Sequence, residues 1–319
     1  PQVPIPPEGA PNILFWVVDD IGFGQLSPYG GPIETPTLQR IVDAGLLYTN
    51  SHTTALCSPT RACLLTGRNH HANHMGTVAE ISTGYPGYDA RIPFENGFLS
   101  EMLASHGYAT VAVGKWPPTP FNDLHLGGAR DRWPLGRGFE RFYGFMGGET
   151  NQWEPSLVRG NEFIEQPKSP EEGYHLSEDL TDTAISYIRD LRAVQPDKPF
   201  FLYLAYGAGH APHHVPVEWA DRYRGRFDEG WEALRAATHR RQIDLGIIPP
   251  GTDLPEHDPE VPTWESFSEE ERRLFARMME VFAGFVSHMD DQFGRLLDYL
   301  EESGQLDNTL IVFVSDNGA

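Results

Sequence analysis

The chain has 319 residues, of which 45 are acidic and 24 are Lys or Arg, so its formal net charge is −21. A surface this acidic repels phosphate backbones, which argues against nucleic acid as a partner. The two cysteines do not suggest a disulfide-stapled scaffold, and no apolar run reaches transmembrane length. We therefore expect a soluble protein, cytoplasmic or periplasmic, with no membrane partner.

The elements expected in chain order alternate between strands and helices. A continuous apolar run over residues 12–18 predicts a strand buried on both faces. Thr35 as N-cap before Pro36 predicts a helix that ends at Gly45. Further strands are expected at 109–113, 200–206 and 309–314, and further helices at 98–106, 177–192 and 268–302. This alternation predicts an α/β fold with a large, mostly parallel central sheet flanked by helices.

Two stretches and the chain end bear on domain organisation. Residues 116–138 and 247–262 are rich in Pro and Gly, and we expect them to be surface loops instead of linkers. The strand-like run 310–314 is followed by only five residues, although a buried strand is an unusual place for a domain to finish. We expect one large domain over residues 1–319, truncated at its C-terminal end.

Acidic pairs follow the first and the last predicted strands. Asp19 and Asp20 come after the first, and Asp316 and Asn317 after the last. Open α/β sheets bind ligands just past the carboxyl ends of their strands. Carboxylates that meet there need a cation, and oxygen ligands suit Ca²⁺ or Mg²⁺. Either pair alone is equally compatible with an ordinary turn.

The run Cys57-Ser58-Pro59-Thr60-Arg61 is the sharpest chemical signal. Pro59 predicts a helix start, which places Cys57 at or just before a helix N-terminus. The helix dipole there favours an anionic nucleophile, and Arg61 one turn later could bind an oxyanion. A thiolate is a poor ligand for a hard, oxygen-bound cation. This mismatch suggests that the sulfur is replaced in the working protein.

This run and the Thr66-Gly67 pair that follows resemble the type I sulfatase signature, C-x-P-x-R and then T-G. The resemblance extends from Asn12 to Gly318 and is closest to bacterial arylsulfatases of the alkaline phosphatase superfamily. It implies an alkaline phosphatase-like fold, an N-terminal catalytic sulfatase domain over 1–319 and a missing C-terminal subdomain. In that family a formylglycine-generating enzyme oxidises the cysteine, here Cys57, to formylglycine.

The resemblance also implies a metal site. Calcium, with magnesium less favoured, would be held by Asp19, Asp20, Asp316, Asn317 and the modified Cys57. Asp316 and the metal would help to deprotonate one hydroxyl of hydrated formylglycine, which attacks sulfur. A covalent sulfate ester forms, and its collapse to the aldehyde releases sulfate.

The remaining family roles fall on three further residues. Arg61 and Lys115 would bind the sulfuryl oxygens and neutralise their charge. His210 would bind the substrate and help to protonate the leaving oxygen. The implied substrate is a small-molecule sulfate ester, and the enzyme would be a sulfuric ester hydrolase.

The sequence departs from the family pattern after Lys115. Family members read G-K-W-H or a close variant, but Pro117 stands where that histidine is expected. In the family this histidine takes a proton from the sulfated intermediate in the second step, which proline cannot do, so that step has no proton acceptor at this position. His125 could replace it from a shifted loop, although an isolated loop histidine is more often a surface residue. The family's C-terminal lysine has no counterpart.

The role of a group of histidines and the choice among three functions stay open at this point. His70 and His74 have the spacing of a helical metal pair, but without a carboxylate at ligand spacing we prefer a structural role. The preferred function is hydrolysis of aryl or small alkyl sulfates. The alternatives are a phosphonate monoester or phosphodiester hydrolase, and a catalytically impaired sulfate-ester-binding protein.

Overall fold

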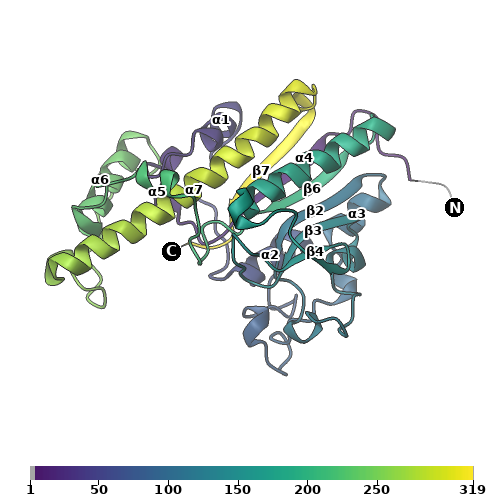
Figure 1. Ribbon diagram of the computed structural model, residues 1–319, viewed down its shortest axis with the longest axis horizontal. Helices are drawn as coiled ribbons and strands as arrows, with labels where there is room; N and C mark the ends of the chain where they lie inside the picture. Colours follow the sequence, from purple (N-terminus) through teal and green to yellow (C-terminus); the bar gives the residue numbers. More distant parts are fainter. Residues whose placement is uncertain (1–3, 319) are drawn as a thin grey trace. The chain divides into compact units, whose positions relative to one another are not determined.

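A computed structural model describes residues 4–318 (Figure 1). Two compact units make up the chain. Unit 1 comprises Pro1–Asp20, Thr53–Pro212 and Arg295–Ala319, and unit 2 comprises Ile21–His52 and His213–Gly294. Within the described part, no helix has both the length and the apolar character needed to cross a membrane.

Unit 1 is built on one seven-stranded sheet in the order β5-β4-β3-β2-β6-β1-β7. The pairs among β3, β2, β6, β1 and β7 are parallel, and only β4 and β5 are added antiparallel. The strands are β1 (Asn12–Val18), β2 (Ala109–Trp116), β3 (Arg141–Met146), β4 (Leu157–Arg159), β5 (Glu162–Ile164), β6 (Phe200–Ala205) and β7 (Thr309–Ser315). The predicted mostly parallel α/β architecture is confirmed.

The described residues form seven α-helices. Their bounds are α1 (Pro36–Ala44), α2 (Cys57–Thr66), α3 (Leu99–Ser105), α4 (Leu176–Val194), α5 (Val217–Asp221), α6 (Gly230–Asp244) and α7 (Glu269–Glu302). Figure 1 shows α4 lying along the sheet, where it contacts β2, β3 and β6. The helices predicted at 36–44, 98–106, 177–192 and 268–302 are confirmed to within two residues at each end.

One core of unit 1 forms between α2, α3 and the sheet. Alternate residues of each strand face it, because side chains alternate between the two faces of a sheet. Its buried members include Ala62 and Leu65 of α2, Trp116 of β2 and Phe201 and Tyr203 of β6. This packing fixes α2, and therefore Cys57, against the carboxyl half of the central strands.

Strand β2 is longer than predicted, because it continues through Gly114 to Trp116. Gly114 reads as a strand end in the sequence, yet here it has a φ of +105°. A Cβ atom at this position would lie 1.8 Å from the carbonyl oxygen of Ala205, so only glycine allows β2 and β6 to approach. The extension puts Lys115 on a strand instead of in a loop.

Two further predictions need correction. The stretch 116–138 was expected at the surface, but Trp133 and Arg137 within it are buried. Strands β3 to β5 and helices α5 and α6 were not predicted. Helix α6 has no apolar stripe, and β3 is interrupted by Gly144, so neither gives a clear periodic pattern.

In unit 2, the N-terminus of α1 is capped from a distant segment. Thr35 is the predicted N-cap, but its hydroxyl lies 3.1 Å from that of Ser27 and makes no capping bond. The carboxylate of Asp290 instead accepts hydrogen bonds from the backbone N–H groups of Thr37 and Leu38, both at 2.9 Å. Burial raises the pKa of Asp290 to about 6, and these two donors act against the rise. Helix α1 is therefore held to α7 by a buried carboxylate.

Replacing Asp290 by Ala should lower the free energy of unfolding by about 1–3 kcal/mol, because it leaves two buried N–H groups without acceptors. Urea denaturation at pH 8, where the carboxyl is ionised, measures the change. Asp291→Ala, which alters the exposed neighbour, serves as the control and should shift stability by less than about 0.5 kcal/mol. Equal midpoints for the two variants would contradict the capping role.

Candidate active site

The two acidic pairs meet at one edge of the sheet, as their places after β1 and β7 led us to expect. The backbone N–H of Asp316 donates to the carbonyl of Val18 at 3.1 Å. The N–H of Asp20 donates to Oδ1 of Asp316 at 3.3 Å, and the amide of Asn317 donates to Oδ1 of Asp20 at 2.6 Å. The turn after β1 puts Asp20 at a φ of +53°, in the left-handed region that non-glycine residues seldom adopt.

Helix α2 begins at Cys57, so the cysteine lies in its first turn as predicted. One carboxylate oxygen of Asp19, one of Asp316 and the Sγ of Cys57 all lie within 4.8 Å of one another. All three residues are buried. Burial raises the pKa of the Cys57 thiol, and the nearby cation Lys115 acts against the rise. The unmodified thiol is therefore protonated at neutral pH and a weak nucleophile.

Arg61 is fully buried and contacts both carboxylates. Its Nε donates to Oδ2 of Asp316 at 2.7 Å, and its Nη2 lies 3.6 Å from Oδ1 of Asp19. Its Nη1 donates to the hydroxyl of Tyr203 at 3.4 Å. The acidic partners hold the pKa of Arg61 well above its ordinary value despite the cost of burial. This side chain is a fixed cation at the base of the cluster.

Lys115, near the end of β2, supplies the second cation. Its Nζ donates a hydrogen bond to Oδ2 of Asp19, and both side chains are without solvent exposure. A buried lysine would lose its proton unless a carboxylate lay beside it. Strand β2 and strand β1 are separated only by β6, which brings this pair together across the sheet.

Charge in the cluster does not balance. Three carboxylates, those of Asp19, Asp20 and Asp316, face two cations, Arg61 and Lys115. Burial raises the pKa of Asp19 to about 7, and the charge of Asp316 adds to the rise. Burial would also raise the pKa of Asp316, but the two cations outweigh it and lower that pKa. A further cation would lower the pKa of Asp19 and allow it to ionise fully at neutral pH beside the ionised Asp316.

Two buried oxygen atoms fit such a cation. Oδ1 of Asp19 and Oδ1 of Asn317 accept no hydrogen bond from the protein. Buried oxygens without a donor are costly, and carboxylate and amide oxygens are the ligands that calcium and magnesium prefer. Among residues 4–318, Asp19, Cys57 and Asp316 are the one set of three potential metal ligands this close together. The residues present therefore fit a hard divalent cation.

His210 lies at the same edge, on the segment that leaves β6. The N–H of Asp19 donates to the carbonyl of Ala208 at 3.1 Å, and the N–H of Gly209 donates to the carbonyl of Asp19 at 2.9 Å. These bonds bring Nε2 of His210 to 3.5 Å from a carboxylate oxygen of Asp20. The half-exposed imidazole is thus placed between the buried cluster and solvent.

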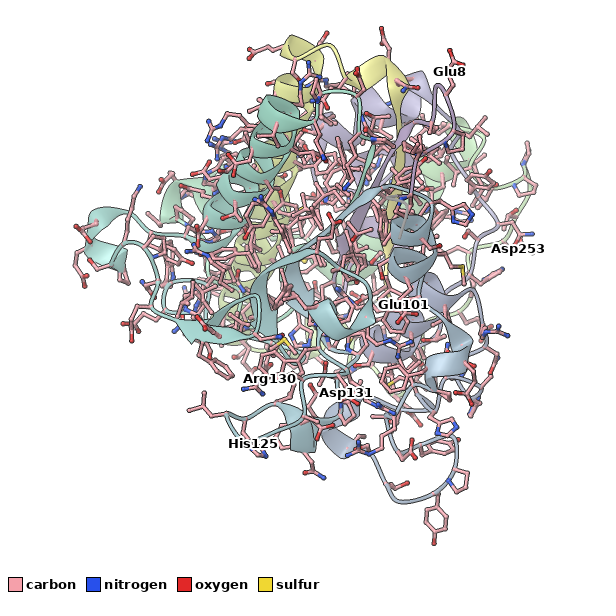
Figure 2. The ribbon with its side chains drawn as sticks, turned by 90° about the vertical axis from the view of Figure 1, so that its right-hand side faces the viewer. Glu8, Glu101, His125, Arg130, Asp131 and Asp253 are labelled. Carbon is pink, nitrogen blue, oxygen red and sulfur yellow. The ribbon has the colours of Figure 1, made fainter. Side chains whose placement is uncertain are left out.

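The other predicted histidines make contacts elsewhere. His125 is exposed, and its Nδ1 accepts from the N–H of Gly127 at 3.1 Å in its own loop. Figure 2 shows it near Arg130, which donates to its carbonyl. His74 pairs with Asp89 at 3.0 Å. That His125 takes over the role of the family histidine expected at position 117 stays a prediction. The contact with Asp89 favours a structural role for His74.

Sequence reasoning missed two residues of the site. Tyr203 lies inside an unbroken apolar strand, where a tyrosine is indistinguishable from core, yet its hydroxyl contacts Arg61. Glu149 stands in a loop after β3, and its Oε2 lies 3.8 Å from Nδ1 of His210. To predict that this loop lies at the sheet edge that carries Lys115, one would have to know that β3 pairs with β2, and the sequence shows no sign of that pairing.

Comparison with known proteins gives a consistent answer. The family model described as Sulfatase matches residues 11–319. An uncharacterised sulfatase of Schizosaccharomyces pombe is 35% identical over 97% of this chain and 58% of its own length. An arylsulfatase of Klebsiella aerogenes is 32% identical over 97% of this chain and 66% of its own. Human N-acetylgalactosamine-6-sulfatase is 29% identical over 97% of this chain and 50% of its own. The chain thus spans about half to two thirds of these relatives.

Solved structures share the fold. A sulfatase from a Pseudoalteromonas species has a TM-score of 0.62 at 21% identity and covers 97% of this chain and 55% of its own. A protein solved with its substrate, D-glucosamine-2-N,6-O-disulfate, has a TM-score of 0.66 at 21% identity, covering 97% and 66%. With the family model matching nearly every residue, this chain belongs to the sulfatase family.

Proposed function

We propose that the protein hydrolyses sulfate esters, with residue 57 as the nucleophile after its oxidation to formylglycine. The observation that carries this proposal is a cysteine at a helix N-terminus whose Sγ lies within 4.8 Å of oxygens of two buried carboxylates. A protonated thiol is a weak nucleophile and a soft ligand, so an oxygen nucleophile suits this acidic surrounding better. Maturation by a formylglycine-generating enzyme is part of the proposal.

The metal in this proposal is calcium. Asp19, Asp20, Asp316 and Asn317 would hold it, together with residue 57. When bound, it would supply positive charge that favours deprotonation of the nucleophile and binding of a sulfuryl oxygen. The buried Oδ1 atoms of Asp19 and Asn317, which accept no hydrogen bond, support this assignment.

Residue 57 and the side chains around it have different roles in the proposed reaction. Hydrated formylglycine offers one hydroxyl for attack on sulfur and a second whose deprotonation allows sulfate to leave. Asp316 is held ionised by Arg61 and Lys115, so it can accept a proton from the attacking hydroxyl. The two cations lie at the base of the cluster, where they can also stabilise charge on sulfuryl oxygens.

His210 is the proposed proton donor to the leaving oxygen. Its Nδ1 lies 2.7 Å from the carbonyl of Ala211, which fixes the ring and turns Nε2 toward Asp20 and the cluster. Pro117, which is buried after β2, takes no part in proton transfer. A half-exposed imidazole can exchange its proton with solvent during turnover.

The first test measures sulfate release from 4-nitrophenyl sulfate by protein co-expressed with a formylglycine-generating enzyme. We expect turnover that is lost in Cys57→Ala and retained in Cys63→Ala, which alters the other free cysteine on the same helix. An aryl phosphonate monoester is assayed beside it. Preferred turnover of the phosphonate would replace the sulfatase assignment, and absence of any turnover after confirmed oxidation of Cys57 would favour a binding protein.

Removal of divalent metal should abolish turnover, and calcium should restore it more fully than magnesium, because calcium accepts a larger and less regular set of carboxylate and amide oxygens. Calorimetric titration of chelator-treated protein is expected to show one calcium site in the wild type and none in Asp316→Asn. Asp253→Asn removes an exposed carboxylate (Figure 2) and should leave calcium binding unchanged. Equal calcium affinity of the two variants would exclude the assigned ligands.

Tyr203→Phe should lower kcat/KM about tenfold, because it removes one of the acceptors that fix the Arg61 guanidinium while preserving the packing of the ring. Tyr206→Phe is the matched control, since this buried tyrosine of the same segment bonds Thr181 at 2.6 Å instead. In an Arg61→Lys background, Tyr203→Phe should have little further effect. Additive losses in this double-mutant cycle would show that Tyr203 does not act through Arg61.

A further inference from the structure

An open cavity of about 490 Å³ lies in unit 1 outside the cluster described above. Two segments line it. Asn151, Trp153 and Glu154 come from the loop between β3 and β4, and Pro170 and Glu171 come from the short 3-10 turn Pro170–Glu172 that precedes α4. The cavity therefore has an indole, a proline, an amide and two carboxylates at its surface.

The β3–β4 loop starts at the edge of the sheet that carries the candidate active site. Lys115 of β2 is paired with Phe145 of β3, and the N–H of Gly147 donates to the carbonyl of Trp116 at 3.1 Å. Two residues later, Oε2 of Glu149 lies 3.8 Å from Nδ1 of His210. The loop therefore runs from Lys115 past His210 to the cavity.

A second contact holds this loop against the segment that leads to His210. A Cβ atom built on Gly207 would lie 3.0 Å from Nε2 of Gln152, so the glutamine side chain packs directly on that backbone. The carbonyl of Gln152 accepts from the N–H of Leu176, the first residue of α4, at 2.9 Å. Gln152, which is buried, thus joins the loop that carries Asn151 and Trp153 to the start of α4 and to the active-site edge.

The orientation of Trp153 is fixed from two sides. Its backbone N–H and that of Glu154 both donate to Oδ1 of Asn151, at 2.8 and 3.1 Å, which locks the turn. Its indole packs edge-on against His175, with ring centroids 4.8 Å apart and an interplanar angle of 84°. The indole is half-buried and lines the cavity, so it offers a preformed apolar surface.

The two charged side chains that line the cavity are both negative. Glu154 and Glu171 are exposed carboxylates, and Glu149 adds a third on the path from His210. No lysine or arginine is among the described residues that line the cavity. Carboxylates accept hydrogen bonds and donate none, so they favour hydroxyl or amino groups and repel anions.

We propose that this cavity, the Trp153 subsite, binds the leaving-group part of the substrate, and that this part is a sugar ring without a second sulfate. The indole surface suits the apolar C–H face of such a ring, and the carboxylates suit its hydroxyl or amino groups. A simple aryl group offers the carboxylates no donors, and a second sulfate meets their repulsion. The inference rests on the proposed function, because it assigns the selectivity of the same site.

The test compares kcat/KM for glucose 6-sulfate, glucosamine 6-sulfate, glucosamine 2-N,6-O-disulfate and 4-nitrophenyl sulfate. Trp153→Ala should lower the values for the two monosulfated sugars about tenfold and change the aryl sulfate less than about twofold, since the aryl ring offers the carboxylates no donors that would hold it over the indole. The first two sugars distinguish hydroxyl from amino recognition, because a larger loss for glucosamine identifies the amine as the bound donor.

The carboxylates are tested by their effect on selectivity. The double variant Glu154→Gln/Glu171→Gln should raise the disulfate-to-monosulfate ratio of kcat/KM about tenfold, and 0.5 M salt should produce part of the same rise in the wild type by screening. Glu162→Gln/Glu165→Gln makes the same charge change at exposed positions nearby in the chain and should leave the ratio unchanged.

The outcomes show whether the subsite assignment or the proposed reaction is wrong. Turnover of the aryl sulfate with unchanged sugar selectivity in both subsite variants would overturn the Trp153 subsite and leave the sulfatase proposal standing. Equal losses for sugar and aryl sulfates in Trp153→Ala would show a structural effect and also overturn the subsite. Absence of turnover with all four substrates would overturn the proposed function, and the subsite would fall with it.

Discussion

The buried ion pairs of Arg61 and Lys115 with Asp316 and Asp19 are the interaction on which the site depends. Each charge alone would be costly in the interior, and the pairing offsets part of that cost. The cations come from α2 and β2, while the carboxylates come from the ends of β1 and β7. The site therefore tolerates little displacement of any of these four elements, because separating one pair leaves a charge buried and unpaired.

Close packing within the sheet holds these four elements in position. Glycine at position 114 lets β2 approach β6, and the parallel pairing places the carboxyl ends of β2, β6, β1 and β7 along one edge. The segment after β6 then bonds to the backbone of Asp19 and carries His210 toward the same edge. Chemistry and substrate contact are thus divided between rigid strand ends and the loops that extend from them.

Much of this arrangement could be predicted from the sequence, because strong local patterns carry it. The apolar run of β1, the acidic pairs after β1 and β7, and the cysteine signature are each short and distinctive. Tyr203 and Gly114 could not be assigned, since the sequence shows an ordinary apolar strand around one and a strand break at the other. Asp290 caps α1 from 253 residues away from Thr37, and no local rule predicts such a partner. The features that could not be predicted depend on contacts between residues that are far apart in the sequence.

The pairing of β1 with β7 also has a consequence for the order of folding. The N–H of Asp20 bonds to a side chain 296 residues further along the chain. Arg61 likewise meets Asp316 across 255 residues. Closing loops of this length costs entropy that local structure does not repay, so such contacts form late. During synthesis, Cys57 and Arg61 leave the ribosome long before Asp316 is made, so the cluster can assemble only after the chain has been extended past this residue.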